Sequence, residues 1–237
     1  MVNKTKVLVL VEGAKTDVNL MKKLFDVYNI NNSHEIVSYK TNIYTLYKEM
    51  FDDKDPSTID LLQLLKEKEP DSEKKKKFDI NYSDIILIFD FDPQDDLFTS
   101  KKIEEMLEYF KESSDMGKLY INYPMVESFY HMKTIPDLNF HEYVVKYEEI
   151  KNYKSIVNKI CFDYRKFAKS KTDVDIVIEN NYEKAKKIIN NNYDDIALLQ
   201  KQCAKLIIEH SIYVICTCCF YILDYNPELV FSKKLKK

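Results

Sequence analysis

The chain has 237 residues, enough to bury a sizeable core in one large domain or in one domain with an appendage. Hydrophobic residues make up 45% of it and charged residues 32%, which excludes a disordered protein. The formal net charge of -3 excludes a protein that binds polyanions with its whole surface, so any contact with nucleic acid requires a local basic patch or a metal ion.

No signal peptide is visible, because the first apolar run is five residues long and stops at Glu12. The most apolar stretch, residues 212–223, is too short to span a bilayer, and we expect a buried helix there. Five cysteines, with Cys216, Cys218 and Cys219 close together, argue against a secreted disulfide framework. We expect these three to be small apolar core residues in a cytoplasmic protein that has no membrane partner.

The first predicted unit is a strand, a turn and a helix. Residues 6–11 (KVLVLV) form a short, valine-rich apolar run, typical of a buried strand. Glu12 and Gly13 begin the turn. Thr16 is the expected N-cap, and Asp17 falls in the first helical turn, where a negative charge suits the helix dipole. The apolar residues that follow recur at helical spacing: Leu20, Met21, Leu24, Phe25 and Tyr28.

Further along the chain, residues 35–39 are predicted as a strand and residues 42–51 and 58–68 as helices. Residues 69–77 are predicted as a polar loop with a run of four lysines. Residues 84–89 (DIILIF) form the second clear buried strand.

The second buried strand ends in Asp90-Phe91-Asp92-Pro93, where the proline forces the chain out of regular structure. Thr99 or Ser100 is then expected to cap a helix, and Gly117 to form a turn. A third buried strand is predicted at residues 118–122, followed by a short helical pattern that contains Glu127 and His131.

Strands that alternate with helices predict an α/β fold, with a mostly parallel sheet flanked by helices. The alternation continues to about residue 132. Beyond it, residues 153–167, 182–189 and 194–223 have helical patterns, and a proline follows the last of them. We therefore expect an α/β domain at residues 1–132 and a mainly helical C-terminal section at residues 133–237.

Acidic residues follow two of the predicted strands. Glu12 ends the first, and Asp90 and Asp92 end the second. In a parallel sheet, ligands bind beyond the carboxyl ends of the strands. Residues i and i+2 of an extended chain point to the same side, so Asp90 and Asp92 are expected to face one point together with Glu12. Converging carboxylates repel unless they take up a proton or a metal ion, and oxygen ligands select Mg²⁺ or Mn²⁺.

Acids at strand ends are common in any fold, so the Glu-Gly and Asp-x-Asp motifs together are more informative than either of them alone. A strand ending in Glu-Gly before a helix, with a later strand ending in Asp-x-Asp, resembles the TOPRIM fold of topoisomerases, primases and OLD-type nucleases. The run Glu12-Gly13-Ala14-Lys15-Thr16-Asp17 is closest to the Glu-Gly-x-Lys-Thr-Glu of RloB-like proteins, a TOPRIM branch associated with phage defence. The resemblance covers residues 5–132, and Asn122, Pro124 and Glu127 loosely match a later element of that branch.

The resemblance implies a TOPRIM-like fold and a metal-dependent nuclease. It implies Glu12 as a general acid or base or as a metal ligand, and Asp90 and Asp92 as ligands of Mg²⁺ or Mn²⁺. Asp17 would be a further ligand, where the branch has Glu. It also implies nucleic acid as the substrate, a role as the effector of an anti-phage system and an ATPase protein partner. Whether the chain forms a homo-oligomer is left open.

Three other features are candidates for parts of the site. Lys15 follows the Glu-Gly turn, where it is either a phosphate contact near the helix start or a solvated lysine. His131 is more often a hydrogen-bonded structural histidine than a ligand. The lysine run at residues 74–77 is more often a solvated loop than a nucleic-acid contact.

Two other functions remain open. Asp90-Phe91-Asp92 after an apolar strand also fits a phosphotransferase of the haloacid-dehalogenase type, with Asp90 as nucleophile and Asp194-Asp195 as its later acidic pair. The third possibility is a non-catalytic module that binds a partner through the helical C-terminal section.

Overall fold

The structure, a computed structural model, describes residues 6–114 and 116–231. It is built around a five-stranded sheet with the order β2-β1-β3-β5-β4. The sheet strands are β1 (Lys6–Val11), β2 (His34–Ser38), β3 (Tyr82–Asp90), β4 (Lys111–Glu112) and β5 (Gly117–Asn122). Four of them are parallel, and the short β4 pairs antiparallel with β5 at one edge. The predicted α/β fold with a mostly parallel sheet and helices at the C-terminus is confirmed.

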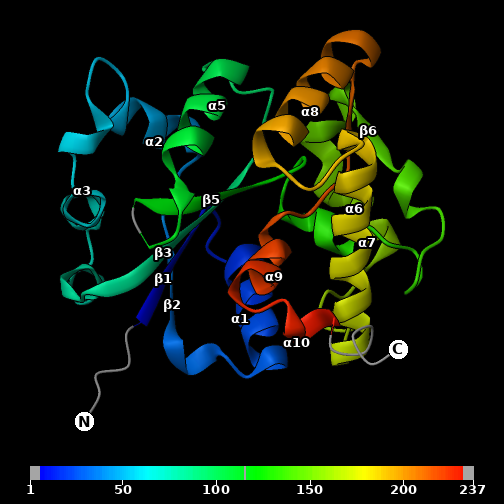
Figure 1. The fold of residues 1–237 in the computed structure, drawn as a ribbon, viewed down its shortest axis with the longest axis horizontal. Helices are drawn as coiled ribbons and strands as arrows, with labels where there is room; N and C mark the ends of the chain where they lie inside the picture. Colours follow the sequence, from blue (N-terminus) through cyan, green and yellow to red (C-terminus); the bar gives the residue numbers. More distant parts are fainter. Residues whose placement is uncertain (1–5, 115, 232–237) are drawn as a thin grey trace.

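Helices cover both faces of this sheet (Figure 1). One face carries α2 (Ile43–Met50), α3 (Leu61–Lys68) and α5 (Ser100–Tyr109), with the short α4 (Ser72–Lys75) before β3. The other face carries α1 (Thr16–Tyr28) and α9 (Tyr221–Tyr225). The central strands β1 and β3 lie between these layers, and their apolar residues are almost completely buried. Such continuous apolar runs are expected of parallel strands covered on both sides.

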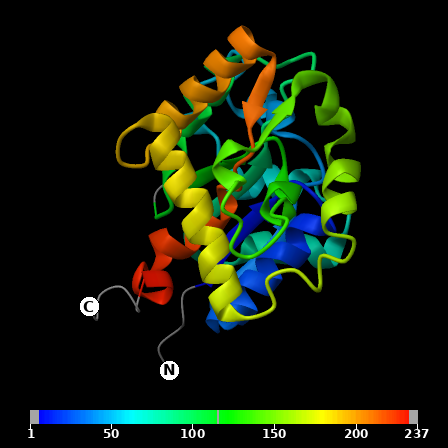
Figure 2. The ribbon, with the colours of Figure 1, turned by 90° about the vertical axis from the view of Figure 1, so that its right-hand side faces the viewer.

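The remaining elements belong to the C-terminal section. They are β6 (Val144–Lys146), α6 (Tyr153–Ile160), α7 (Lys171–Ile189), α8 (Asp195–Glu209), β7 (Ser211–Tyr213) and α10 (Glu228–Phe231). β6 and β7 form a separate antiparallel pair. In Figure 2, α7 crosses the molecule in front of the sheet and α6 descends along its side. One continuous hydrophobic core includes residues on both sides of position 132.

Most predicted elements of the first half occur within a few residues of their expected bounds. Thr16 is not the N-cap of α1, because Lys15 occupies that position and the helix begins at Thr16. Gly117 does not form a turn outside the strand but begins β5, with φ at +121°. This positive φ favours glycine, and a β-carbon there would also lie 2.7 Å from Leu87 Cδ1. Residues 69–77, predicted as a loop, contain α4 and the start of a 3₁₀ turn at Lys76–Asp79.

The largest error concerns residues 194–223, which were predicted as one helix. The helix α8 ends at Glu209, and His210 follows it in the left-handed conformation with φ at 48°. Residues 211–217 are extended or irregular and contain several β-branched side chains, which favour a pleated backbone. A short apolar run is compatible with a buried strand or a buried helix, so periodicity does not separate them. Likewise, the helix predicted at 153–167 ends at Ile160.

Among the described residues, no helix has the length and apolarity needed to cross a membrane.

Candidate functional site

The acidic residues lie where the connections of the sheet change direction. The neighbouring strands β1 and β3 are parallel, but the chain leaves β1 for α1 on one face and β3 for α5 on the other (Figure 1). In open α/β sheets, a crevice forms at this switch point beyond the carboxyl ends of the strands, and ligands bind there. Glu12 follows directly after β1 and Asp90 is the last residue of β3, so both residues lie at this switch point.

Glu12 is held in place by the neighbouring strand β3. Its backbone N–H donates to Ile88 O at 3.1 Å, and its side-chain Oε2 accepts from the backbone N–H of Asp90 at 3.2 Å. Burial raises the pKa of Glu12 to about 7, although the amide of Asp90 acts in the opposite direction. The negative charges of Asp17, Asp92 and Asp95 raise it further. Glu12 can therefore exchange a proton near neutral pH.

Asp17 reaches the same crevice from the first turn of α1. It is 5% exposed, and its Oδ1 accepts from the backbone N–H of Gly13 at 3.1 Å. A β-carbon on Gly13 would lie 2.3 Å from Asp17 Oδ2, so only glycine at this turn permits the contact. Burial raises the pKa of Asp17, and the charge of Glu127 contributes in the same direction.

Asp90 occupies the centre of the cluster. Its Oδ1 accepts from the backbone N–H of Val126 at 2.9 Å, which ties the end of β3 to the segment after β5. Burial raises the pKa of Asp90 well above its usual range, and the charges of Glu12, Asp17 and Glu127 add to that effect. The structure thus brings Glu12, Asp17 and Asp90 together as three mutually repelling carboxylates, which we call the acidic cluster.

Asp92 does not continue the extended geometry of β3. The strand ends at Asp90, and Asp92 has φ at 25°, in the region that side chains rarely adopt. The expectation that Asp90 and Asp92 share a side by strand alternation is therefore wrong. Tyr44 stabilises the turn, because its hydroxyl donates to the carbonyls of Phe91 at 2.7 Å and Asp92 at 3.2 Å.

Asp92 nevertheless remains part of the crevice. Burial raises its pKa, the charge of Asp95 adds to this, and Lys151 opposes it. Its charge also acts on Glu12. The charge of Asp92 therefore acts together with those of the acidic cluster.

Sequence reasoning missed the cations of the site and gave Glu127 little weight. Glu127 is 3% exposed, in the 3₁₀ turn Val126–Tyr130, and its Oε1 lies 2.9 Å from the Nζ of Lys154. The same ammonium group lies 3.3 Å from Thr16 Oγ1. Lys154 belongs to α6, in the section predicted as separate from the site, and no local pattern marks it. The one available signal was an acid within an otherwise apolar segment, residues 124–130.

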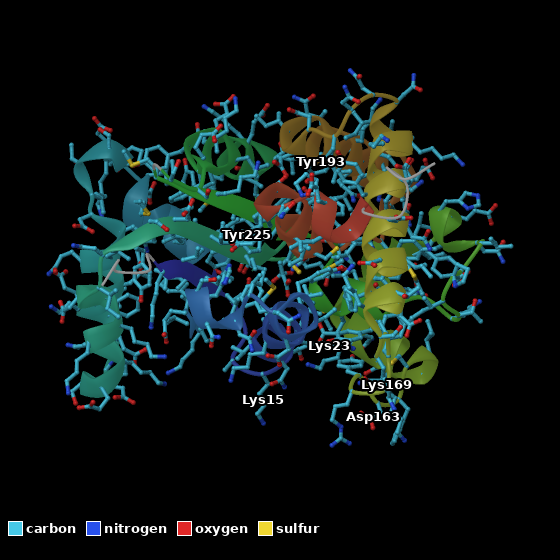
Figure 3. The ribbon with its side chains drawn as sticks, turned by 60° about the horizontal axis from the view of Figure 1, so that its bottom comes forward. Lys15, Lys23, Asp163, Lys169, Tyr193 and Tyr225 are labelled. Atoms are coloured by element: carbon cyan, nitrogen blue, oxygen red, sulfur yellow. The ribbon has the colours of Figure 1, made fainter. Side chains whose placement is uncertain are left out.

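Two other predicted site residues, Lys15 and His131, do not belong to the acidic cluster. Lys15 is exposed at the start of α1 and projects from the edge of the molecule in Figure 3. His131 is 8% exposed, and its Nδ1 lies 2.7 Å from the hydroxyl of Tyr153. Burial lowers the pKa of His131 to about 4, and the charges of Lys184 and Lys133 add to this, so the ring is neutral at pH 7. These contacts agree with a structural histidine.

The three clustered cysteines are all completely buried. Cys216 Sγ lies 3.4 Å from Cys218 Sγ and 3.6 Å from Asn122 Oδ1. Their burial agrees with the prediction of small core residues.

The acidic cluster suits a divalent cation in donor type and in charge. It offers carboxylate oxygens, the ligands that Mg²⁺ and Mn²⁺ prefer, and its raised pKa values reflect burial first and then repulsion, which a cation would relieve. Each carboxylate has two oxygens, so one amide contact does not exhaust its capacity. In the part of the chain that the structure describes, however, no three Asp, Glu, His or Cys side chains are close enough to form a complete ligand set.

Comparisons of the chain with protein-family models, with curated proteins and with solved structures gave no match. The functional assignment therefore depends on the residues and their geometry.

Proposed function

We propose that the chain is a nuclease that depends on Mg²⁺ or Mn²⁺ and hydrolyses phosphodiester bonds in DNA or RNA. The observation that carries this proposal is the convergence of Glu12, Asp17 and Asp90 at the switch point of a parallel sheet, each with a raised pKa. The resemblance of the Glu-Gly and Asp-x-Asp segments to TOPRIM proteins supports the same chemistry. That resemblance is also the basis for proposing a role in phage defence with an ATPase partner.

In this proposal, Asp17, Asp90 and Asp92 hold the metal ion with Glu12 beside them. The bound ion would polarise the phosphate and lower the pKa of a water molecule. Glu12, with a pKa of about 7, carries a proton to or from the reacting oxygen as a general acid or base. The charge of Lys151 acts on Asp92 and Lys154 pairs with Glu127, so these two cations would attract and orient a phosphate group beside the acids.

A phosphotransferase would need Asp194 and Asp195 as its later acidic pair, and the contacts of these two residues favour the nuclease instead. Asp194 is the N-cap of α8 and accepts from the backbone N–H of Ala197 at 2.7 Å. Asp195 forms an ion pair with Lys118, at 3.0 Å. Both acids are thus engaged in structural contacts, and the acids that act on Asp90 are Glu12, Asp17 and Glu127.

The test is incubation of the protein with single-stranded DNA, duplex DNA and transfer RNA, with Mg²⁺, Mn²⁺ or a chelator. We expect metal-dependent cleavage by the wild type and its loss in Glu12→Gln. A phosphatase would hydrolyse p-nitrophenyl phosphate and retain that activity in Glu12→Gln. Normal biological activity of a variant that combines Asp90→Asn with Asp92→Asn would instead favour the non-catalytic module.

A further inference from the structure

We infer that the loop after α6 is a binding subsite for an unpaired nucleotide of the substrate, with Phe162 as the stacking platform. This inference rests on the proposed function and specifies its substrate as a nucleic acid with a single-stranded segment.

The side chain of Phe162 packs against almost nothing and is exposed to solvent. Its relative exposure is 95%, the highest of the exposed large hydrophobic side chains in the described residues. An isolated exposed apolar residue is ordinary, but a fully exposed ring beside cations is the arrangement with which proteins stack bases and contact phosphates. Arg165, three residues further on, is the only arginine in the chain.

The charge around this loop differs from that of the whole protein. Residues 151–171 contain seven lysines and arginines against one aspartate, a net charge of +6, whereas the whole chain has a net charge of -3. Asp163 offsets part of this, because Arg165 Nε lies 2.9 Å from its Oδ1. Arg165 is itself 91% exposed and contacts Asp163 through Nε and Nη2, at 2.9 and 3.2 Å, so the remaining N–H groups of its guanidinium can donate to a phosphate. The charge complements a polyanion.

A groove lies beside Phe162. It has a volume of about 470 Å³, and its lining includes Met132, Lys133, Ile135, Lys166 and Phe167. That volume falls within the range typical of small-ligand pockets, roughly 300–1,000 Å³. The groove therefore has apolar walls for a base and two lysines for the adjoining phosphates, and two carboxylates, those of Asp163 and Asp173, also line it.

Helix α6 connects this groove to the acidic cluster. Lys154, in its first turn, contacts Glu127 at the crevice, and Phe162 follows two residues after its last residue. Lys154, Asn158 and Lys159 are exposed along it. Eight helical residues span about 12 Å, a distance that a few nucleotides of one strand can cover. A strand bound at the crevice can thus reach Phe162.

The cations of α1 lie near the same loop. Lys23 donates a hydrogen bond to the carbonyl of Phe167, so the loop packs against the middle of α1. Figure 3 shows Lys15, Asp163 and Lys169 along the same lower edge of the view, with Lys23 between them. Lysines of α1 and of the loop therefore lie at the same end of the molecule.

The test is fluorescence anisotropy with labelled oligothymidylate and oligouridylate of about 15 nucleotides and with a duplex of equal length, each with Ca²⁺ replacing Mg²⁺. Phe162→Ala is expected to weaken single-strand binding about 10-fold, and Phe162→Trp to restore it. The matched control is Ile208→Ala, which removes another exposed apolar side chain, on α8. A second pair compares Arg165→Gln/Lys166→Gln with Lys74→Gln/Lys75→Gln. Only the first double variant should reduce affinity and its salt dependence.

Equal binding by wild type and Phe162→Ala would overturn the inference, as would equal effects of Phe162→Ala on single strands and duplex. Absence of binding to any of the oligonucleotides would also overturn the inference. The surface would then suit a different partner, such as an acidic protein. The proposed function is tested separately, because Glu12→Gln should lose cleavage and keep Phe162-dependent binding. Intact cleavage without a role for Phe162 overturns only the subsite. Phe162-dependent binding without metal-dependent cleavage overturns only the nuclease.

Discussion

The carboxylate of Glu12 accepts a hydrogen bond from the backbone amide of Asp90 at 3.2 Å, although 78 positions separate them in the sequence. This contact joins the ends of the two central strands and places the side chain of Glu12 beside that of Asp90. Both carboxylates are deprived of water and repel each other. The fold therefore holds negative charge together at a cost in stability, as is expected where a cation or a proton is bound.

The first prediction concerns pH. The pKa of Glu12 is raised from 4.5 to about 7, so the folded state binds this proton more tightly than the unfolded state. The contribution of Glu12 to the free energy of unfolding is therefore fully present below pH 4.5, and it is lost as the pH rises towards 7. At 1.36 kcal/mol per pKa unit, the loss is about 3 kcal/mol. Urea unfolding of Glu12→Gln should give a higher free energy of unfolding than the wild type at pH 8 and a similar one at pH 4.5.

The second prediction concerns divalent cations. Because a cation relieves the repulsion among Glu12, Asp17 and Asp90, Mg²⁺ or Mn²⁺ should raise the melting temperature at pH 8 more than at pH 5. A concentration 100 times the dissociation constant corresponds to about 2.7 kcal/mol, or roughly 5–10 °C for a chain of this size. Differential scanning fluorimetry measures the shift. Asp90→Asn is the matched variant, and a shift as large as that of the wild type would contradict the assignment.

The third prediction concerns the buried carboxylate of Glu127. Lys154→Met removes its cationic partner, and we expect a loss of about 1–3 kcal/mol because a buried charge is left uncompensated. Adding Glu127→Gln should restore most of this stability in a double-mutant cycle measured by urea unfolding. The exposed pair Lys76 and Glu73 is the control, with an expected coupling below about 0.5 kcal/mol. Similar coupling energies for both pairs would argue against a special role for Lys154.

The fourth prediction concerns Gly13. In Gly13→Ala, the new methyl group would meet Asp17 Oδ2 at 2.3 Å, and the flexible carboxylate must move away. The fold should survive, because the clash is with the end of a side chain and not with the backbone. We expect Mn²⁺ affinity to fall at least about 10-fold, a change of 1.4 kcal/mol in binding free energy. Ala14→Ser, at the exposed neighbouring position, serves as the control, and an equal affinity in Gly13→Ala would show that Asp17 is not a ligand.

The sequence was sufficient to predict the strand before Glu12 and the strand before Asp90, because a short, continuous apolar run that ends in a turn is typical of a buried strand in an α/β chain. From these two strands, the position of both acids at the sheet edge followed. The direction of Asp92 did not follow, because it depends on a positive φ that Tyr44 stabilises from α2. Lys154 was not predictable either, because it reaches Glu127 through packing of a helix whose distance from the sheet no local pattern encodes. The extended segment after His210 was missed for a similar reason, since its β-branched residues were assigned to a buried helix.

The central claim is that Asp17, Asp90 and Asp92 hold one divalent cation with Glu12 beside them. Titration of Mn²⁺ into the protein, followed by electron paramagnetic resonance of the free ion, counts bound ions and gives their affinity. The account predicts one site per chain at pH 8, weakened at least about 10-fold by Glu12→Gln and by Asp90→Asn. Both substitutions preserve the shape of the side chain and its ability to accept the amide hydrogen bond, so loss of binding would reflect the charge. Mn²⁺ binding of equal strength in the wild type and in both variants, or no Mn²⁺ binding by the wild type, would contradict the account.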